Sequence, residues 1–179
     1  MVNPNGDLKN KVSIVIPIRR GEDITGVIES IKQSTYANYE IIVVDEGKER
    51  SEQRNTGIKQ ARGDYLLILD SDQHITKNLL LECVYLMKHY DALYIPEEIK
   101  TEGFFGRLRN WERQFYTGTP VDVVRFVRRK DCPLFDTRMH GPEDADWGRR
   151  VRGKRGITFN KLLHYDNVCL LYTSPSPRD

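Results

Sequence analysis

The chain has 179 residues, enough for one domain with a sizeable core. A formal net charge of +2 is too small to indicate nucleic-acid binding, no apolar run is as long as a membrane span, and no signal-peptide core follows Met1. Cys83, Cys132 and Cys169 have neither metal-ligand spacing nor an even-numbered framework, so we expect a reducing, cytoplasmic location.

The first half of the chain predicts strands that alternate with helices. Short apolar, β-rich runs predict strands, and apolar residues spaced three and four apart predict amphipathic helices. The predicted strands cover residues 11–18, 40–45, 65–69 and 92–95. The predicted helices cover residues 24–31, 51–61 and 76–87, the last two with Ser51 and Thr76 as N-caps. This alternation indicates an α/β fold with a mostly parallel sheet.

Beyond Pro96 the pattern is less regular. It predicts a helix over residues 104–116, a strand over 121–127 and a short helix over 143–152. Because no linker separates the halves, we expect both to share one sheet. Basic residues crowd the segment from Arg125 to Arg155, either as a solvated face or as a surface for phosphates or an anionic membrane.

The last eleven residues, Cys169 to Asp179, resemble a translated sequencing adapter, because every codon of such an adapter can be matched to them. A natural Ser/Pro-rich tail is the alternative. We expect a domain over residues 1–168, truncated at its C-terminus, and a non-native tail over residues 169–179.

The predicted strand over residues 65–69 ends in two carboxylates, Asp70 and Asp72. In an open α/β sheet they would emerge at the carboxyl end of the strand, where ligands bind. Two acids there suit Mg²⁺ or Mn²⁺ shared with substrate phosphates, because such ions take oxygen ligands and few of them from the protein. Taken alone, the Asp-x-Asp is more simply an N-cap of the next helix.

Acidic residues also close the two preceding strands. The segment from Pro17 to Glu22 ends the first strand, and Asp45 ends the second. Parallel strands would bring these ends to the Asp-x-Asp, and Arg54 opens the intervening helix. Acids for a ribose or base, an arginine for a uracil-like ring or phosphate, and a metal site together fit a nucleoside diphosphate. No Gly-rich dinucleotide or Walker motif is present.

A second acidic cluster, residues 143–146, follows a Gly-Pro turn. Negative charge is favoured in the first turn of a helix, so a plain helix N-terminus would explain it. The functional interpretation is Asp144 as a general base beside Trp147. Asp146 and Arg150, four residues apart, can pair and hold the segment rigid.

Several motifs occur together in a fixed order. They are Val12-Ser-Ile-Val-Ile-Pro17, Ile41-Ile-Val-Val-Asp45, Gln53-Arg54-Asn55-Thr-Gly57, Ala61-Arg-Gly63-Asp64-Tyr65, Asp70-Ser-Asp72 and Glu143-Asp144-x-Asp146-x-x-x-Arg150. With them the chain resembles the family-2 nucleotide-sugar glycosyltransferases, which implies a Rossmann-like A-type fold with a mostly parallel central sheet flanked by helices. Ile95-Pro-Glu97 and Arg125-Phe126 further resemble a subgroup associated with cell-surface polysaccharide synthesis.

The resemblance implies a role for each site residue. The nucleotide sugar would be bound by Pro17, Glu22, Asp45, Arg54, Asp70 and Ser71. Mn²⁺ or Mg²⁺ would be held by Asp72, Asp70 and His164, although a strand-end histidine explains His164 equally well. Asp144 would deprotonate the acceptor hydroxyl, and attack opposite the leaving diphosphate would invert the anomeric centre. The acceptor would be a glycan or lipid-linked saccharide at the cytoplasmic membrane face. The protein would touch the membrane peripherally and would bind no nucleic acid.

Three alternatives stay open. A haloacid-dehalogenase-type phosphatase also uses Asp-x-Asp, but its motif needs Thr or Val where His74 stands and normally follows the first strand. A sugar-phosphate nucleotidyltransferase would need a Gly-rich N-terminal loop. An inert nucleotide-sugar-binding fragment is the non-enzymatic alternative, since a truncation would remove parts of the acceptor site.

Overall fold

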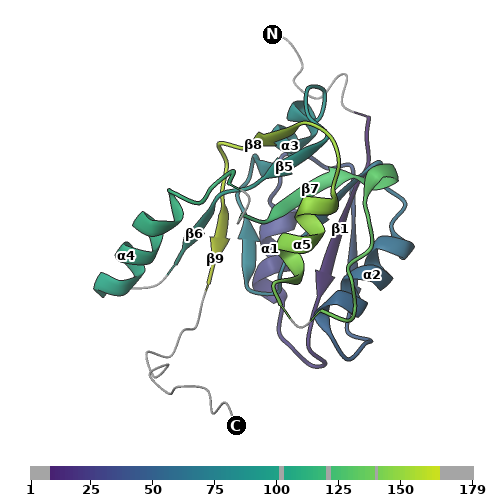
Figure 1. Cartoon of the computed structure of the whole chain (residues 1–179), viewed down its shortest axis with the longest axis horizontal. Helices are drawn as coiled ribbons and strands as arrows, with labels where there is room; N and C mark the ends of the chain where they lie inside the picture. Colours follow the sequence, from purple (N-terminus) through teal and green to yellow (C-terminus); the bar gives the residue numbers. More distant parts are fainter. Residues whose placement is uncertain (1–8, 101–102, 120–121, 140, 166–179) are drawn as a thin grey trace.

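A computed structural model describes residues 9–100, 103–119, 122–139 and 141–165 (Figure 1). The predicted non-native tail over residues 169–179 lies outside these described residues. Among them, no helix is both long enough and apolar enough to cross a bilayer.

A six-stranded sheet forms the centre of the molecule. Its strands are β1 (Val12–Pro17), β2 (Tyr39–Val44), β3 (Tyr65–Ile68), β5 (Ala92–Tyr94), β7 (Val124–Arg128) and β8 (Arg155–Ile157), in the order β2-β1-β3-β7-β5-β8. β1 is parallel to β2 and β3, and β5 is parallel to β8, whereas β7 is antiparallel to both of its neighbours. The predicted α/β fold with a mostly parallel sheet is confirmed.

A second, three-stranded sheet lies beside the first. It contains β4 (Gln73–Ile75), β6 (Glu97–Ile99) and β9 (Leu162–His164), in the order β4-β9-β6. The two halves of the chain share the central sheet, as expected, and the second sheet is an addition that the sequence pattern did not predict. Each of these strands has three residues, too few to show a period-two pattern in the sequence.

Helices cover both faces of the central sheet (Figure 1). They are α1 (Thr25–Lys32), α2 (Arg50–Gln60), α3 (Leu79–Leu86), α4 (Gly103–Arg113) and α5 (Glu143–Arg150), with a short 3₁₀ helix η1 (Arg129–Asp131). Ile14 and Ile16 of β1 pack in the core cluster of α1 and α3, and Val15 packs in the cluster of α2 and α5. A sheet buried on both faces explains the continuous apolar runs of the strands. α4 lies to one side, against β6 (Figure 1).

Two predicted helix caps are wrong. α2 begins at Arg50 after Glu49, and Ser51 is buried inside the helix. α3 begins at Leu79, and the Thr76 hydroxyl instead contacts Asn160 and Lys161, which lie just before β9. At Thr76 a tertiary contact takes the hydroxyl that the local pattern assigned to a cap. The predicted helix 104–116 ends earlier, at Arg113, and the strand predicted over 121–127 is Val124–Arg128.

Candidate active site

The carboxyl ends of β1 and β2 border a cavity of about 570 Å³. Pro17 pairs in register with Val44, so Asp45 follows beside it at the same edge of the sheet. The residues lining this cavity include Pro17, Glu22, Asp45 and Ser71, four of the six that the sequence predicts as nucleotide contacts. Arg19, Lys48 and Arg50 add positive charge to its wall. We call it the nucleotide cavity.

Glu22 fixes the loop that follows β1. Its backbone N–H donates to the Arg19 carbonyl, and Gly21 supplies the positive φ of +79° that this turn needs. The two oxygens of Glu22 accept hydrogen bonds from the Arg19 backbone N–H, at 2.7 Å, and from the Ser71 hydroxyl, at 2.7 Å. Glu22 therefore ties this loop to the Asp-x-Asp loop.

Asp70 lies between two buried arginines. Its Oδ1 accepts from Arg54 at 2.9 Å, and its Oδ2 accepts from Arg125 at 3.0 Å. Burial by itself would raise the pKa of Asp70, but the charges of Arg125 and Arg54 outweigh burial and hold that pKa well below its ordinary value. Asp70 is thus an ionised carboxylate with both oxygens engaged by protein.

Arg54 connects Asp70 to the predicted general base. Its side chain is only 1% exposed, packs over the Phe135 ring, and reaches Asp144 Oδ1 at 2.5 Å and Glu143 at 3.2 Å. This contact forms because α2 and α5 cover the same face of the sheet. Arg54 does not line the nucleotide cavity. Burial is the main cause that raises the pKa of Asp144, although Arg54 opposes it.

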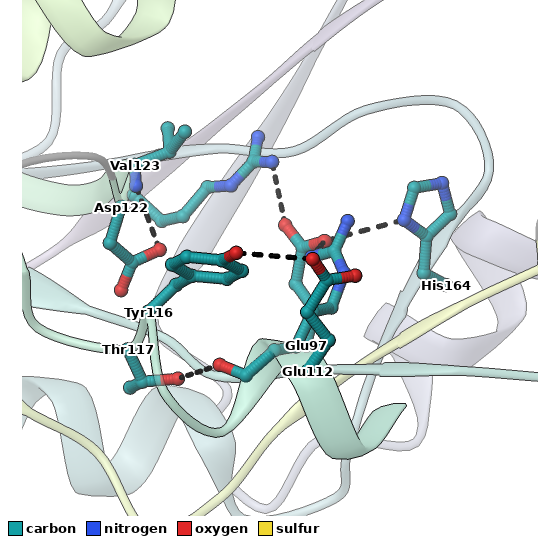
Figure 2. A pocket seen from close by; sticks show the side chains of 9 residues that line it. Glu97, Glu112, Tyr116, Thr117, Asp122, Val123 and His164 are labelled. Atoms are coloured by element: carbon teal, nitrogen blue, oxygen red, sulfur yellow. Dashed lines mark hydrogen bonds and ion pairs between the residues drawn. The ribbon is translucent and has the colours of Figure 1, made fainter. Parts of the chain in front are cut away.

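Glu97, at the start of β6, continues the series of charges. It accepts from Arg125 at 2.7 Å and lies 3.3 Å from Nδ1 of His164 (Figure 2). His164 Nε2 in turn lies 3.1 Å from Asp72 Oδ2, because β9 pairs with β4 so that His164 is opposite Gln73. Alternating charges therefore connect α5 to the second acid of the Asp-x-Asp, in the order Asp144, Arg54, Asp70, Arg125, Glu97, His164 and Asp72. We call this series the ion network.

Two members of the ion network were given no role by the sequence interpretation. Arg125 is a charged residue inside the apolar strand β7, and Glu97 follows Pro96 just beyond the end of β5. A charge that interrupts a buried strand was a usable indication of Arg125, since such residues are rarely buried without partners. The partners themselves are distant in sequence.

The residues around Asp72 suit a divalent cation with few protein ligands. Across the described residues, no group of three or more His, Cys, Asp or Glu side chains is arranged to hold a metal ion. Asp72 and His164 are the pair that could hold one, with waters and phosphates as the other ligands. Glu97 at His164 Nδ1 is the carboxylate partner that metal-binding histidines commonly have.

His164 should make the stability of the metal-free protein depend on pH. Its hydrogen bonds to Asp72 and Glu97 raise its pKa from 6.5 to about 9. A raised pKa means that the protonated ring stabilises the folded state. This contribution is complete below about pH 6.5 and is lost as the pH rises through about 9. We expect the melting temperature in EDTA to fall over this range more steeply in the wild type than in His164→Gln. Equal slopes would contradict the placement of His164.

Arg54→Gln should be strongly destabilising. The substitution leaves Asp144 without its cation and leaves Asp70 with Arg125 alone, and removing one partner of a buried ion pair costs about 3–5 kcal/mol. Urea unfolding of Arg54→Gln measures the loss, and Lys59→Gln, which removes an exposed charge from the same helix, is the matched control. A nucleoside-contacting arginine would instead lower nucleotide affinity and leave the unfolding free energy nearly unchanged.

Residues 46–141 match the domain family described as Glycosyl transferase family 2. An uncharacterized glycosyltransferase of Haemophilus influenzae is 32% identical over 205 residues, covering 92% of this chain and 70% of that protein. The chain belongs to glycosyl transferase family 2. It is therefore a glycosyltransferase, and the phosphatase and nucleotidyltransferase alternatives are wrong.

Other similar proteins agree with this class. Glycosyltransferase GlyG of Streptococcus pneumoniae is 27% identical over 109 residues, covering 45% of this chain and 36% of GlyG. The crystal structure of S. aureus TarS matches with a TM-score of 0.68 at 18% identity, over 87% of this chain and 37% of TarS. The complex of TarS 1-349 with UDP-GlcNAc matches with a TM-score of 0.66 at 18% identity, over 87% of this chain and 58% of that one. This likeness confirms the Rossmann-like A-type fold.

Proposed function

We propose that this chain transfers a sugar from a nucleoside-diphosphate sugar to a hydroxyl of a glycan or lipid-linked saccharide, with a divalent cation and with inversion. The observation that carries the proposal is the ion network. It links Asp144 to Asp72 directly beside the nucleotide cavity. A base, a cation site and a nucleotide site at one sheet edge are the parts that such a transfer needs.

The nucleotide cavity would receive the donor. Asp45 and Glu22 would face the nucleoside, and Arg19 and Arg50 would attract the diphosphate. Crystal structures of TarS 1-349 contain UDP and UDP-GlcNAc, which supports a UDP-sugar as the first donor to test.

Asp72 and His164 would hold Mn²⁺ or Mg²⁺. Asp70 would join them only if one of its arginine pairs opened, because both of its oxygens are engaged. A cation bound there supplies Lewis-acid stabilisation of the departing diphosphate. Glu97 would keep Nε2 of His164 directed toward Asp72.

Asp144 would act as the general base. Its raised pKa brings the carboxylate closer to the basicity that proton abstraction requires, and Arg54 keeps it in place. Proton removal by Asp144 would activate the acceptor hydroxyl, and attack from the side opposite the diphosphate would invert the anomeric centre.

Exposed basic residues beside α5 support peripheral contact with the cytoplasmic membrane face. The basic segment divides into two groups in space. Arg125, Arg128 and Arg155 bond carboxylates or carbonyls inside the protein, whereas Arg149, Arg152 and Lys154 are exposed. The exposed group supports attraction to phosphate-rich acceptors or anionic lipid.

A donor screen tests the proposal. The 179-residue protein is incubated with UDP-, GDP- and dTDP-sugars and a saccharide mixture, and released nucleoside diphosphate is measured with Mn²⁺, Mg²⁺ or EDTA. We expect release from one nucleotide class that EDTA abolishes. The chain spans 37% of TarS and 36% of GlyG, which keeps an inert nucleotide-sugar-binding fragment as the second candidate. Calorimetric donor binding without any turnover would favour that candidate.

A further inference from the structure

A second cavity, of about 540 Å³, is lined by Glu97, Arg125 and His164 of the ion network and by residues from the end of α4 and beyond it (Figure 2). Its outer wall is the end of α4 and the turn that follows, with Glu112, Tyr116 and Asp122. Its inner wall is made by Arg125 and His164. We call it the α4 cavity.

The α4 cavity is separated from the nucleotide cavity by the Asp-x-Asp. The two cavities share no lining residue. Arg125 bonds Asp70, and His164 lies 3.1 Å from Asp72, so the inner wall of the α4 cavity is in direct contact with both acids. A diphosphate at Asp72 would therefore lie between a nucleoside on one side and any ligand of the α4 cavity on the other.

The lining of the α4 cavity suits hydroxyl groups rather than anions. Asp122 is held in place by the backbone N–H groups of Gly118 and Val123, each at 2.8 Å, and a carboxylate has further acceptor sites for hydroxyl donors. The Tyr116 hydroxyl donates to Glu112 at 3.1 Å. A phosphate group in this cavity would be repelled by Glu112 and Asp122. The arginines of the wall, Arg113 and Arg125, would not offset this repulsion, because they already pair with carboxylates.

Exposed aromatic rings occur at the end of α4 and in the turn after it, and one of them, Tyr116, lines the α4 cavity. Trp111, Phe115 and Tyr116 are 58%, 61% and 45% exposed, and the Trp111 and Phe115 ring centroids lie 4.9 Å apart in an edge-on arrangement. Exposed apolar groups gathered in one place mark an interaction surface. The C–H face of a pyranose packs against an aromatic ring while its hydroxyls bond carboxylates, so rings beside acids match a saccharide.

We propose that the α4 cavity binds the accepting end of a neutral, hydroxyl-rich saccharide, with its ring against Tyr116 and its hydroxyls on Asp122 and Glu112. This inference rests on the proposed function, because it assigns the acceptor of that same reaction. The acceptor hydroxyl would then lie across the diphosphate from the nucleoside.

The test uses methyl glycosides of glucose, galactose and N-acetylglucosamine as probes. Their binding to the 179-residue protein with UDP and Mg²⁺ is measured by saturation-transfer NMR. We expect at least one glycoside to bind the wild type, with affinity lowered about 10-fold in Tyr116→Ala and in Asp122→Asn. Tyr85→Ala is the matched control, since Tyr85 is 55% exposed on α3, outside the α4 cavity. Melting curves check that each variant folds.

Three results would overturn the assignment. The first is that no glycoside binds the wild type, or that the cavity variants bind as the wild type does. The second is that Asp122→Asn loses affinity for a UDP-sugar but not for UDP, because the cavity would then hold the transferred sugar. The third is that Tyr116→Ala abolishes pelleting with phosphatidylglycerol vesicles and leaves glycoside binding intact, which would assign the rings to a bilayer. Glycoside binding without any nucleotide-sugar binding would reject the proposed function and not this site.

Discussion

Asp144→Asn is expected to lower turnover by about 10²-fold or more, the usual loss of rate when a general base is removed. Donor affinity should stay nearly unchanged. The amide cannot accept a proton from the acceptor hydroxyl. It is nearly isosteric with the carboxylate and can still accept a hydrogen bond from Arg54, so α5 should keep its position. Rates of nucleoside diphosphate release at saturating donor, together with calorimetric donor binding, measure the two effects separately.

Asp146→Asn is the matched control for this experiment. Asp146 is two residues further along α5, and it pairs with Arg150 at 2.8 Å instead of joining the ion network. Loss of this helix pair should cost about 0.3–0.5 kcal/mol of stability and no activity. If Asp144→Asn lost donor affinity and kept its turnover at saturation, Asp144 would belong to the nucleotide site instead.

Asp72→Asn is expected to abolish metal-dependent donor binding and to leave the fold nearly intact. Among the described side chains, Asp72 is the carboxylate within 3.1 Å of His164 Nε2, and neither Arg54 nor Arg125 engages it. The substitution removes one direct ligand and the charge that offsets the cation. Donor titrations with Mn²⁺ and with EDTA should therefore differ in the wild type and coincide in Asp72→Asn.

Asp64→Asn is the comparison variant for Asp72. Asp64 comes directly before the first residue of β3, at the end of the strand away from Asp72. It is exposed and accepts a hydrogen bond from the Lys11 backbone N–H at 2.9 Å. It should bind donor and metal as the wild type does. Donor affinity in Mn²⁺ that is the same in Asp72→Asn as in the wild type would remove Asp72 from the metal site.

The sequence predicted the regular part of the fold well, since the central strands are continuous apolar runs and the helices carry apolar residues spaced three and four apart. The strands at residues 12–17, 39–44 and 65–68 and the helices between them follow the predicted pattern with shifts of one or two residues. The pairing of Asp146 with Arg150 is confirmed, because a spacing of four on a helix fixes the distance. The three-residue strands β4, β6, β8 and β9 were missed because three residues give neither a long apolar run nor a period.

The candidate site was predicted in part, because the sequence pattern located the ends of the parallel strands. Parallel strands place their carboxyl ends at one edge, so Pro17, Asp45 and Ser71 could be expected around one cavity. Arg54 could not be placed this way. Its position in the sequence, at the start of α2, is compatible with a nucleoside contact, and only the packing of α5 on the same face brings Asp144 to it.

The sequence by itself determined the family, the alternation of strands and helices, and the residue types at the ligand edge of the sheet. These follow from local periodicity and from short motifs. Only the tertiary structure decided how the charges are paired. Glu97 meets His164 across 67 positions of sequence, and Arg125 meets Asp70 across 55. Pairing of this kind depends on the antiparallel placement of β7 and on the small sheet of β4, β9 and β6, and long-range strand pairing of short segments leaves no local pattern for the sequence to display.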